Sequence, residues 1–165
     1  MRRLYSAMIA GLLLVGVMVA PASAAGPGTI ADIAVANGNF TTLVAALSCT
    51  DLVGAVADPA AKLTVFTPTD SAFRKFGLTS NNVCRLPKAL LKNILLYHVA
   101  PGELKASDVL ALKRIKMLDG LYTFPSVRHG NAYINWYAKI VATDIQASNG
   151  VIHVIDSVLI PYRLW

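Results

Sequence analysis

A chain of 165 residues is long enough for one domain with a buried core, but it is too short for several domains of ordinary size. Its 15 lysines and arginines exceed its 9 acidic residues, giving a formal net charge of +6. Only Lys113, Arg114 and Lys116 form a tight basic cluster, and nucleic-acid binding normally needs a denser basic face. The composition therefore argues against a nucleic-acid partner.

Residues 1–24 have the layout of a secretory signal peptide. Arg2 and Arg3 precede an apolar run over 4–20, Pro21 ends that run, and Ala22-Ser23-Ala24 fits the small-residue pattern of a cleavage site. An uncleaved anchor helix is the alternative, but the run is at the short limit for spanning a bilayer. We expect cleavage after residue 24, secretion or release into the periplasm, and a mature chain without a membrane span.

The first half of the mature chain predicts mainly helices. A short Gly/Pro leader over 25–28 precedes a helix whose apolar face carries Phe40, Leu43, Val44 and Leu47. A second short helix is expected over 51–56. The β-branched run at 63–67 then predicts a strand.

Three more helices are predicted after that strand. Thr69 or Asp70 should cap a helix that continues through residue 76. Leu86-Pro87 should open the next helix, since proline is tolerated in a first helical turn. Ser107 or Asp108 should cap a last short helix.

The second half predicts strands separated by turns. Strand-like runs occupy 115–118, 121–127, 132–136, 140–143 and 151–155, and turn signals such as Asp119-Gly120 and Asn149-Gly150 separate them. Helices thus come mostly first and antiparallel strands mostly last. This segregation indicates an α+β fold in one domain.

Cys49 and Cys84 are the two cysteines of the chain. An even pair in an exported protein suggests a disulfide, and the alternative is two buried free thiols. We expect the bridge, because closing a loop of this length would stabilise the fold by about 4 kcal/mol on the chain-entropy model.

Three segments carry a family resemblance when taken together. They are Thr64–Phe73 (TVFTPTDSAF), Leu95–Val99 (LLYHV) and Asn149–Pro161 (NGVIHVIDSVLIP). In this order the chain resembles the fasciclin-like domain family over residues 29–161, leaving 162–165 as a C-terminal tail. Thr67 replaces the alanine that is usual in the first block, and Trp136-Tyr137 matches no family pattern.

The resemblance implies a wedge of antiparallel strands with helices packed around it and a C-terminal β-meander. It also implies adhesion or surface association through an extracellular protein or glycan. In animal members, receptor binding is attributed to two pairs that match Tyr97-His98 and Asp144-Ile145 here. We expect Asp144 and Ile145 to form the main contact and Tyr97 to be second.

Structural roles compete with each of these binding roles. His98 should be mainly a hydrogen-bonded histidine near a helix end, and Tyr97 lies about 100° around the helix from it. Asp144 could instead cap a turn and Ile145 could fill the core. His153 alternates with Val151 and Ile155, which predicts a core or edge histidine.

Catalysis is not expected, and neither is a cofactor or a metal. The sequence has no GxSxG elbow, no HExxH spacing and no glycine-rich phosphate loop after a strand. A carrier of a carotenoid- or lipid-like ligand is the alternative function. Aromatic residues would support it if they were exposed: Tyr122, Phe124, Tyr133, Trp136 and Tyr137. Oligomeric state and partner identity stay open.

Overall fold

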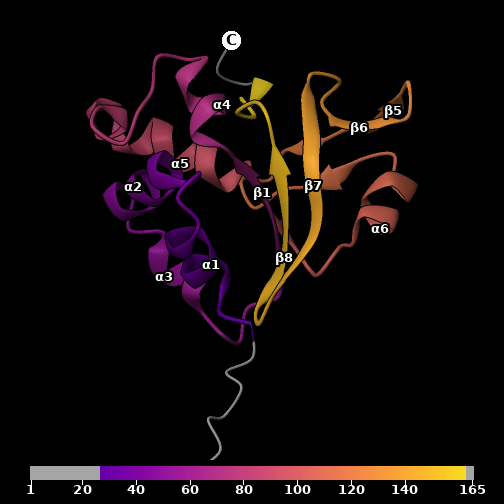
Figure 1. Ribbon diagram of the computed structural model, residues 1–165, viewed down its shortest axis with the longest axis horizontal. Coiled ribbons are helices and arrows are strands. Elements are labelled where there is room, and N and C mark those ends of the chain that lie inside the picture. Colours follow the sequence, from indigo (N-terminus) through magenta and orange to yellow (C-terminus); the bar gives the residue numbers. More distant parts are fainter. Residues whose placement is uncertain (1–26, 163–165) are drawn as a thin grey trace, which may run out of the picture.

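A curled six-stranded sheet divides the molecule into a helical side and a smaller side made of strands and one helix (Figure 1). The structure is a computed structural model that describes residues 27–162. The predicted signal peptide and most of the predicted tail lie outside these residues.

The helical elements all precede β3 (Ile115–Lys116) in the chain, and within the described residues β3 to β8 (Gly150–Ile155) follow with no helix between them. They are α1 (Ile30–Ala36), α2 (Thr41–Cys49), α3 (Val53–Ala57), α4 (Asp70–Arg74), the 3-10 helix η1 (Val83–Arg85), α5 (Lys88–Leu96) and α6 (Ala106–Ala111). The strands are β1 (Leu63–Pro68), β2 (Val99–Pro101), β3 (Ile115–Lys116), β4 (Tyr122–Thr123), β5 (Pro125–Arg128), β6 (Asn131–Ile134), β7 (Ala138–Ala147) and β8 (Gly150–Ile155).

The expected α+β fold and its C-terminal meander are confirmed. The large sheet has the order β2-β1-β8-β7-β6-β5, and β3 pairs with β4 in a separate two-stranded sheet. β5 to β8 are antiparallel neighbours, whereas β1 lies parallel to β8, so the sheet is mixed and not purely antiparallel. The residue pattern of a strand predicts which of its faces is buried. It does not predict whether a strand from a distant part of the chain will pair with it in parallel or antiparallel orientation.

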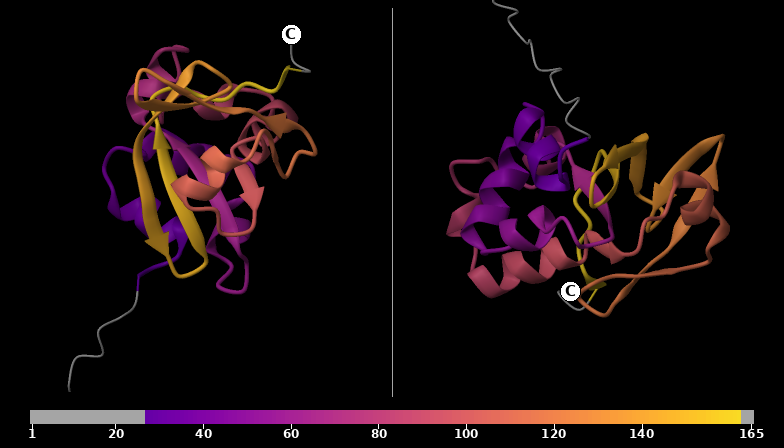
Figure 2. Two further views of the ribbon diagram at one scale, coloured as in Figure 1. Left: turned by 90° about the vertical axis from the view of Figure 1, so that its right-hand side faces the viewer. Right: turned by 90° about the horizontal axis from the view of Figure 1, so that it is seen from below.

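Both faces of the β1–β8 pair are buried, which explains why every residue of these strands is inaccessible. Val65 and Ile152 face the helices α1–α5, where Leu43 and Leu95 complete a first core. On the other face, a second core gathers under α6 and the β3–β4 pair. Its largest members are Phe66, Tyr97, Met117, Ile134, Ile155 and Leu159. Figure 2 shows helices and meander on opposite sides of this pair.

The segment after β1 caps two helices. Thr69 caps α4, since its hydroxyl accepts a hydrogen bond from Ala72 N (3.2 Å). The Asp70 carboxylate accepts from Thr42 N (2.7 Å) and from Thr41 N (3.2 Å) and the Thr41 hydroxyl (2.8 Å) at the start of α2. Burial alone would raise the pKa of Asp70, but these hydrogen bonds lower it below its usual value. The predicted motif is therefore a structural clamp between α2 and α4.

Several predicted boundaries were wrong for local reasons. α4 ends at Arg74, and the predicted cap of α6 is replaced by Lys105, so Ser107 and Asp108 lie inside that helix. The predicted strand 132–136 stops at Ile134, because Asn135 and Trp136 adopt left-handed backbone angles (φ 51° and 65°).

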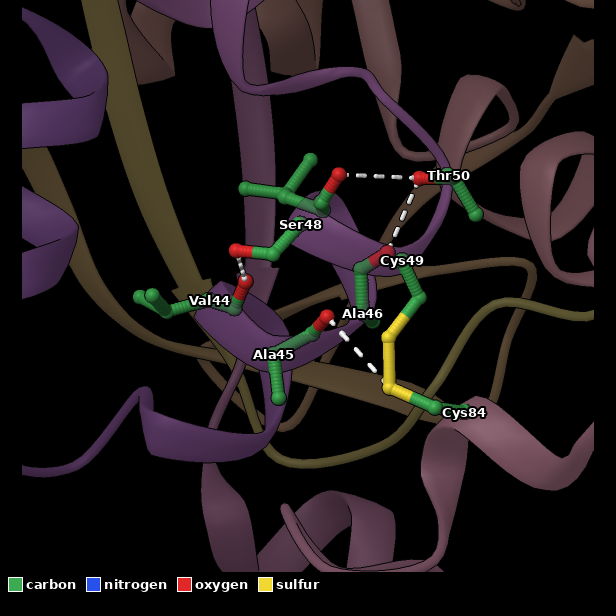
Figure 3. The surroundings of a disulfide bond; sticks show 8 residues. Val44, Ala45, Ala46, Ser48, Cys49, Thr50 and Cys84 are labelled. Atoms are coloured by element: carbon green, nitrogen blue, oxygen red, sulfur yellow. Dashed lines mark hydrogen bonds between the residues drawn. A yellow bond between two sulfur atoms is a disulfide. The ribbon is translucent and has the colours of Figure 1, made fainter.

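The predicted disulfide is present between the end of α2 and η1 (Figure 3). The Cα atoms of Cys49 and Cys84 are 5.8 Å apart, within the usual range for a bridge. Beside it, the Thr50 hydroxyl donates to Ala46 O (2.8 Å) and Leu47 O (3.2 Å), which satisfies carbonyls at the end of α2. The bridge thus fastens η1 to the end of α2, where the Thr50 hydroxyl already accounts for two carbonyls.

Candidate functional site

His98 is a buried link between two parts of the chain. It lies two residues after the end of α5 and is only 2% exposed. Its Nδ1 lies 2.7 Å from Ile94 O and therefore carries the proton, while Nε2 accepts a hydrogen bond from Leu159 N (2.8 Å). Burial lowers the pKa of His98 to about 4. The ring is neutral near pH 7 and joins α5 to the segment after β8.

Tyr97 is buried as well, with 1% of its surface exposed. Its hydroxyl donates to Tyr122 O (2.9 Å) and accepts from Asn135 Nδ2 (3.0 Å). Burial raises the pKa of the Tyr97 hydroxyl above its usual value. The Tyr97 and His98 side chains therefore hydrogen-bond in different directions, and neither forms part of the outer surface.

Asp144 and Ile145 lie in the middle of β7, at an irregularity of the β7–β8 pairing. Ala142 pairs with Val154 and Ile145 with Ile152, so Thr143 and Asp144 together oppose His153 alone. This is the two-against-one arrangement of a β-bulge, and Asp144 adopts a left-handed φ of 57° within it. We call residues 141–145 the β7 bulge.

Hydrogen bonds fix the β7 bulge on both sides. Asp144 Oδ1 accepts from Ala106 N (2.8 Å) at the start of α6, and Asp144 N donates to His153 Nδ1 (3.4 Å). His153 Nε2 in turn lies 2.8 Å from Leu104 O. Asp144 is exposed, whereas Ile145 is half-buried against the first core. Asp144 thus caps α6 instead of the expected turn.

The two predicted contact pairs are not joined into one site. Within residues 27–162, no hydrogen bond connects Tyr97 or His98 to Asp144 or Ile145. His153 is buried, as predicted, and its ring stacks on Phe66 with centroids 5.5 Å apart. The histidine that contacts the β7 bulge is therefore His153.

A cavity of about 520 Å³ is lined mainly by the segment after α4, the β6–β7 hairpin and the segment after β8. Figure 1 shows where α4, β6, β7 and β8 lie in the molecule. Asn135 and Ile160 form part of its lining, and the rest is aromatic. The six aromatic residues are Phe76, Tyr97, Phe124, Trp136, Tyr137 and Tyr162. We call this space the aromatic cavity.

The sequence pointed to only part of the aromatic cavity. Phe124, Trp136 and Tyr137 belong to the predicted aromatic group. Phe76 and Tyr162 lie far from that group in the sequence, and no sequence pattern connected them with it. The available clue was Asn135 followed by two large aromatic residues in a turn, since Asn favours left-handed backbone and such a turn exposes the rings beside it.

Metal binding and membrane crossing have no support in residues 27–162. No three His, Cys, Asp or Glu side chains in this range come close enough to hold a metal ion. No helix in the same range is both long and apolar enough to cross a bilayer.

Comparison with known proteins agrees with this architecture. Protein sll1483 of Synechocystis sp. is 39% identical over 135 residues, which cover 81% of this chain and 73% of that protein. The transforming growth factor-beta-induced protein ig-h3 of Sus scrofa is 34% identical over 134 residues, covering 81% of this chain and 19% of that one.

A solved structure has the same fold. It is a FAS1 domain pair from the insect cell adhesion molecule fasciclin I, with a TM-score of 0.69 and 17% identity, covering 82% of this chain and 52% of that one. The family model described as Fasciclin domain matches residues 38–161. With the shared fold, the sequence blocks and this match, the chain belongs to the Fasciclin domain family.

Proposed function

We propose that this protein is an exported, non-catalytic association module that binds an extracellular protein or glycan, with the β7 bulge as its contact surface. Fasciclin-family membership supports an adhesion role, since the solved structure of this fold comes from a cell adhesion molecule. The layout of residues 1–24 supports export to the periplasm or the medium.

The observation that carries the proposal is the exposed carboxylate of Asp144, which a hydrogen bond holds in the β7 bulge. Val141 is 53% exposed, and Thr143 is exposed next to Asp144. The hydrogen bonds from Ala106 N and to His153 Nδ1 hold the bulge in place, so little conformational entropy would be lost on binding. An exposed acidic group in a bulge that also exposes Val141 suits a partner with a cationic or amide group next to apolar surface.

Tyr97 and His98 have secondary roles in this proposal. A partner can reach Tyr97 only through the aromatic cavity, because the rest of its side chain is buried. His98 has both ring nitrogens occupied by backbone groups, so its role is structural.

The same hydrogen bonds support a non-catalytic role. General-base catalysis needs a histidine, or another base, aligned on a nucleophile. His98 and His153 instead hydrogen-bond to backbone atoms, and no serine or threonine hydroxyl in residues 27–162 is hydrogen-bonded to either ring. We therefore propose binding without turnover.

Binding to the producing cells and to a panel of matrix proteins and glycans tests the proposal. The exported protein is recovered, its first residue is read by mass spectrometry, and it is displayed on beads in many copies, because one domain offers one copy of the site. The variant Asp144→Asn keeps an oxygen for Ala106 N and tolerates left-handed backbone, yet it removes the charge. We expect it to weaken saturable binding roughly tenfold.

The matched control is Asp58→Asn. Asp58 is also exposed, and its carboxylate also accepts a backbone hydrogen bond, from Ala60 N (2.9 Å). The control should bind like the wild type. Equal weakening by both variants would indicate a general charge effect, and unchanged binding by Asp144→Asn would move the contact surface away from the β7 bulge. No saturable binding to any surface would reject the adhesion role.

A further inference from the structure

We propose that the aromatic cavity is a binding site for a compact, uncharged, planar ring molecule. Its volume of about 520 Å³ falls within the range of small-molecule sites in proteins, about 300–1,000 Å³. This binding is separate from the proposed adhesion function, since the cavity lies at the hairpin end of β7 and the β7 bulge lies in the middle of that strand.

The walls of the aromatic cavity favour a flat ligand. The rings of Phe124 and Trp136 are nearly parallel, with 11° between their planes and 5.5 Å between their centroids. Trp136 is nevertheless 54% exposed, so one of the largest apolar side chains of the chain stands at the rim instead of in the core. A planar ring placed against this pair would continue the stack and cover exposed apolar area.

The backbone holds Trp136 in that position at some cost. Asn135 and Trp136 are consecutive non-glycine residues with positive φ, a conformation that is rare for a tryptophan. Asn135 is fixed there by three hydrogen bonds: its N donates to Phe124 O, its Oδ1 accepts from Phe124 N, and its Nδ2 donates to Tyr97 Oη. Strained backbone that is held by its surroundings is concentrated at binding sites.

The polar side-chain groups of Tyr97, Asn135 and Tyr137 are already hydrogen-bonded within the protein, whereas those of Trp136 and Tyr162 stand on half-exposed side chains. Besides the Tyr97 and Asn135 contacts, the Tyr137 hydroxyl donates to Val158 O (3.3 Å) and accepts from Ile160 N (3.1 Å). None of the lining residues is charged. A peptide or a sugar would bring more donors and acceptors than the exposed polar groups of Trp136 and Tyr162 could satisfy, and the rest would lose water without gaining partners. An uncharged ring system would lose little, which is why we assign this chemical class.

The uncharged fluorophore N-phenyl-1-naphthylamine is the probe for this site. The chain has two tryptophans, so the purified full-length Trp165→Phe protein leaves Trp136 as the single energy donor. We expect saturable, one-to-one binding of the probe, with energy transfer from Trp136 to the naphthalene ring. Absence of saturable binding to the folded protein would overturn the proposal.

Two comparisons make the test specific. The variant Trp136→Asn removes the ring, and asparagine tolerates the left-handed backbone at this position. Trp165 is retained in this variant, and binding is followed by probe fluorescence. The substitution should weaken binding roughly tenfold. Val35→Ser removes an exposed apolar side chain from α1, outside the cavity lining, and should leave binding unchanged. Equal loss in both variants, or no loss in Trp136→Asn, would overturn the proposal.

The charge of the ligand is tested with 8-anilino-1-naphthalenesulfonate, which has the same ring skeleton and an added sulfonate. It should bind at least roughly tenfold more weakly, despite the positive net charge of the protein. Binding as tight as that of the uncharged probe would overturn the assignment. A chain shortened to end at Tyr162 completes the set: probe binding that appears only after this shortening would mean that residues 163–165 fill the cavity, which would also overturn it.

Discussion

Asn149, in the turn before β8, and Gly150, the first residue of β8, have separate structural roles. The Asn149 side chain is fully buried and bonds only to backbone: Oδ1 accepts from Ile30 N (2.8 Å), and Nδ2 donates to Val56 O and Asp58 O (2.9 Å each). It therefore ties α1 and the end of α3 to the sheet. Gly150 allows β1 and β8 to approach, because a Cβ at this position would lie against the carbonyl oxygen of Leu63.

We expect Gly150→Ala to be strongly destabilising. The added methyl group would meet backbone atoms of β1, which cannot rotate away as a side chain could. The free energy of unfolding in urea should fall by roughly 4 kcal/mol or more, or the protein should fail to fold.

The matched glycine control is Gly54→Ala. Gly54 lies inside α3 with open space around the position of a Cβ, so alanine should stabilise the protein by up to about 1 kcal/mol. A Gly150→Ala protein as stable as the wild type would show that β1 and β8 are farther apart than this structure has them.

At the scale of elements, α2 is held by contacts from distant parts of the chain. Its N-cap residue makes no side-chain cap, and Asp70, the first residue of α4, supplies that cap from 28 or 29 residues away. Its other end is bound to η1 by the Cys49–Cys84 disulfide. η1 is a single short 3-10 turn with few hydrogen bonds of its own. The disulfide therefore fixes its position against α2.

Replacing both cysteines by alanine should lower the free energy of unfolding by about 4 kcal/mol, because the unfolded chain regains the freedom of a 35-residue loop. Urea unfolding of the variant measures this loss. The wild type with excess reductant should approach the same value, whereas a variant as stable as the oxidised wild type would show that the bridge contributes nothing to stability.

At the scale of the whole molecule, His98 couples the helical side to the far end of the chain. Its ring accepts from Leu159 N and is fixed to Ile94 O, so α5 and the segment that lines the aromatic cavity depend on one neutral imidazole. Protonation would remove the acceptor and place a charge in the core. The proton affinity of this one ring therefore makes the stability of the entire domain depend on pH.

We expect acid to destabilise the protein well above the titration range of its carboxylates. The pKa of His98 is about 4 in the folded protein and 6.5 in the unfolded chain. As the pH falls below 6.5, the unfolded chain therefore binds a proton at this residue before the folded protein does. The stabilisation is present above pH 6.5 and is lost as the pH falls towards 4. Between pH 7 and 4.5 the free energy of unfolding should drop by about 2 kcal/mol from this group.

Urea unfolding of wild type and His98→Gln at both pH values measures the effect. The variant should be less stable at pH 7, but its loss between pH 7 and 4.5 should be smaller than that of the wild type by about the same 2 kcal/mol. His129→Asn is the control, because His129 is exposed and its backbone has a left-handed φ that asparagine tolerates. This variant should keep the full pH dependence of the free energy of unfolding. Identical pH slopes in wild type and His98→Gln would contradict the prediction.

The sequence by itself determined the features that depend on near neighbours or on simple counting. The strand before Pro68, the Thr69 cap, the turn before β8 and the α+β order of elements each rest on residues within about four positions of one another. The disulfide was expected because an even pair of cysteines in an exported chain favours a bridge over free thiols, and two cysteines allow only one pairing. The blocks Thr64–Phe73 and Asn149–Pro161 were sufficient to indicate the family that the comparisons show.

Only the tertiary structure decided the features that need distant partners. Three such features are the parallel pairing of β1 with β8, the capping of α6 by Asp144 and the hydrogen bond from Leu159 N to the His98 ring. They join residues between 38 and 87 positions apart. No local sequence pattern predicts which distant residue will become the hydrogen-bond or strand partner, because the packing of both cores determines which residues come together. For the same reason the sequence indicated only part of the aromatic cavity: its rings become neighbours only when the segment after α4, the β6–β7 hairpin and the segment after β8 fold together.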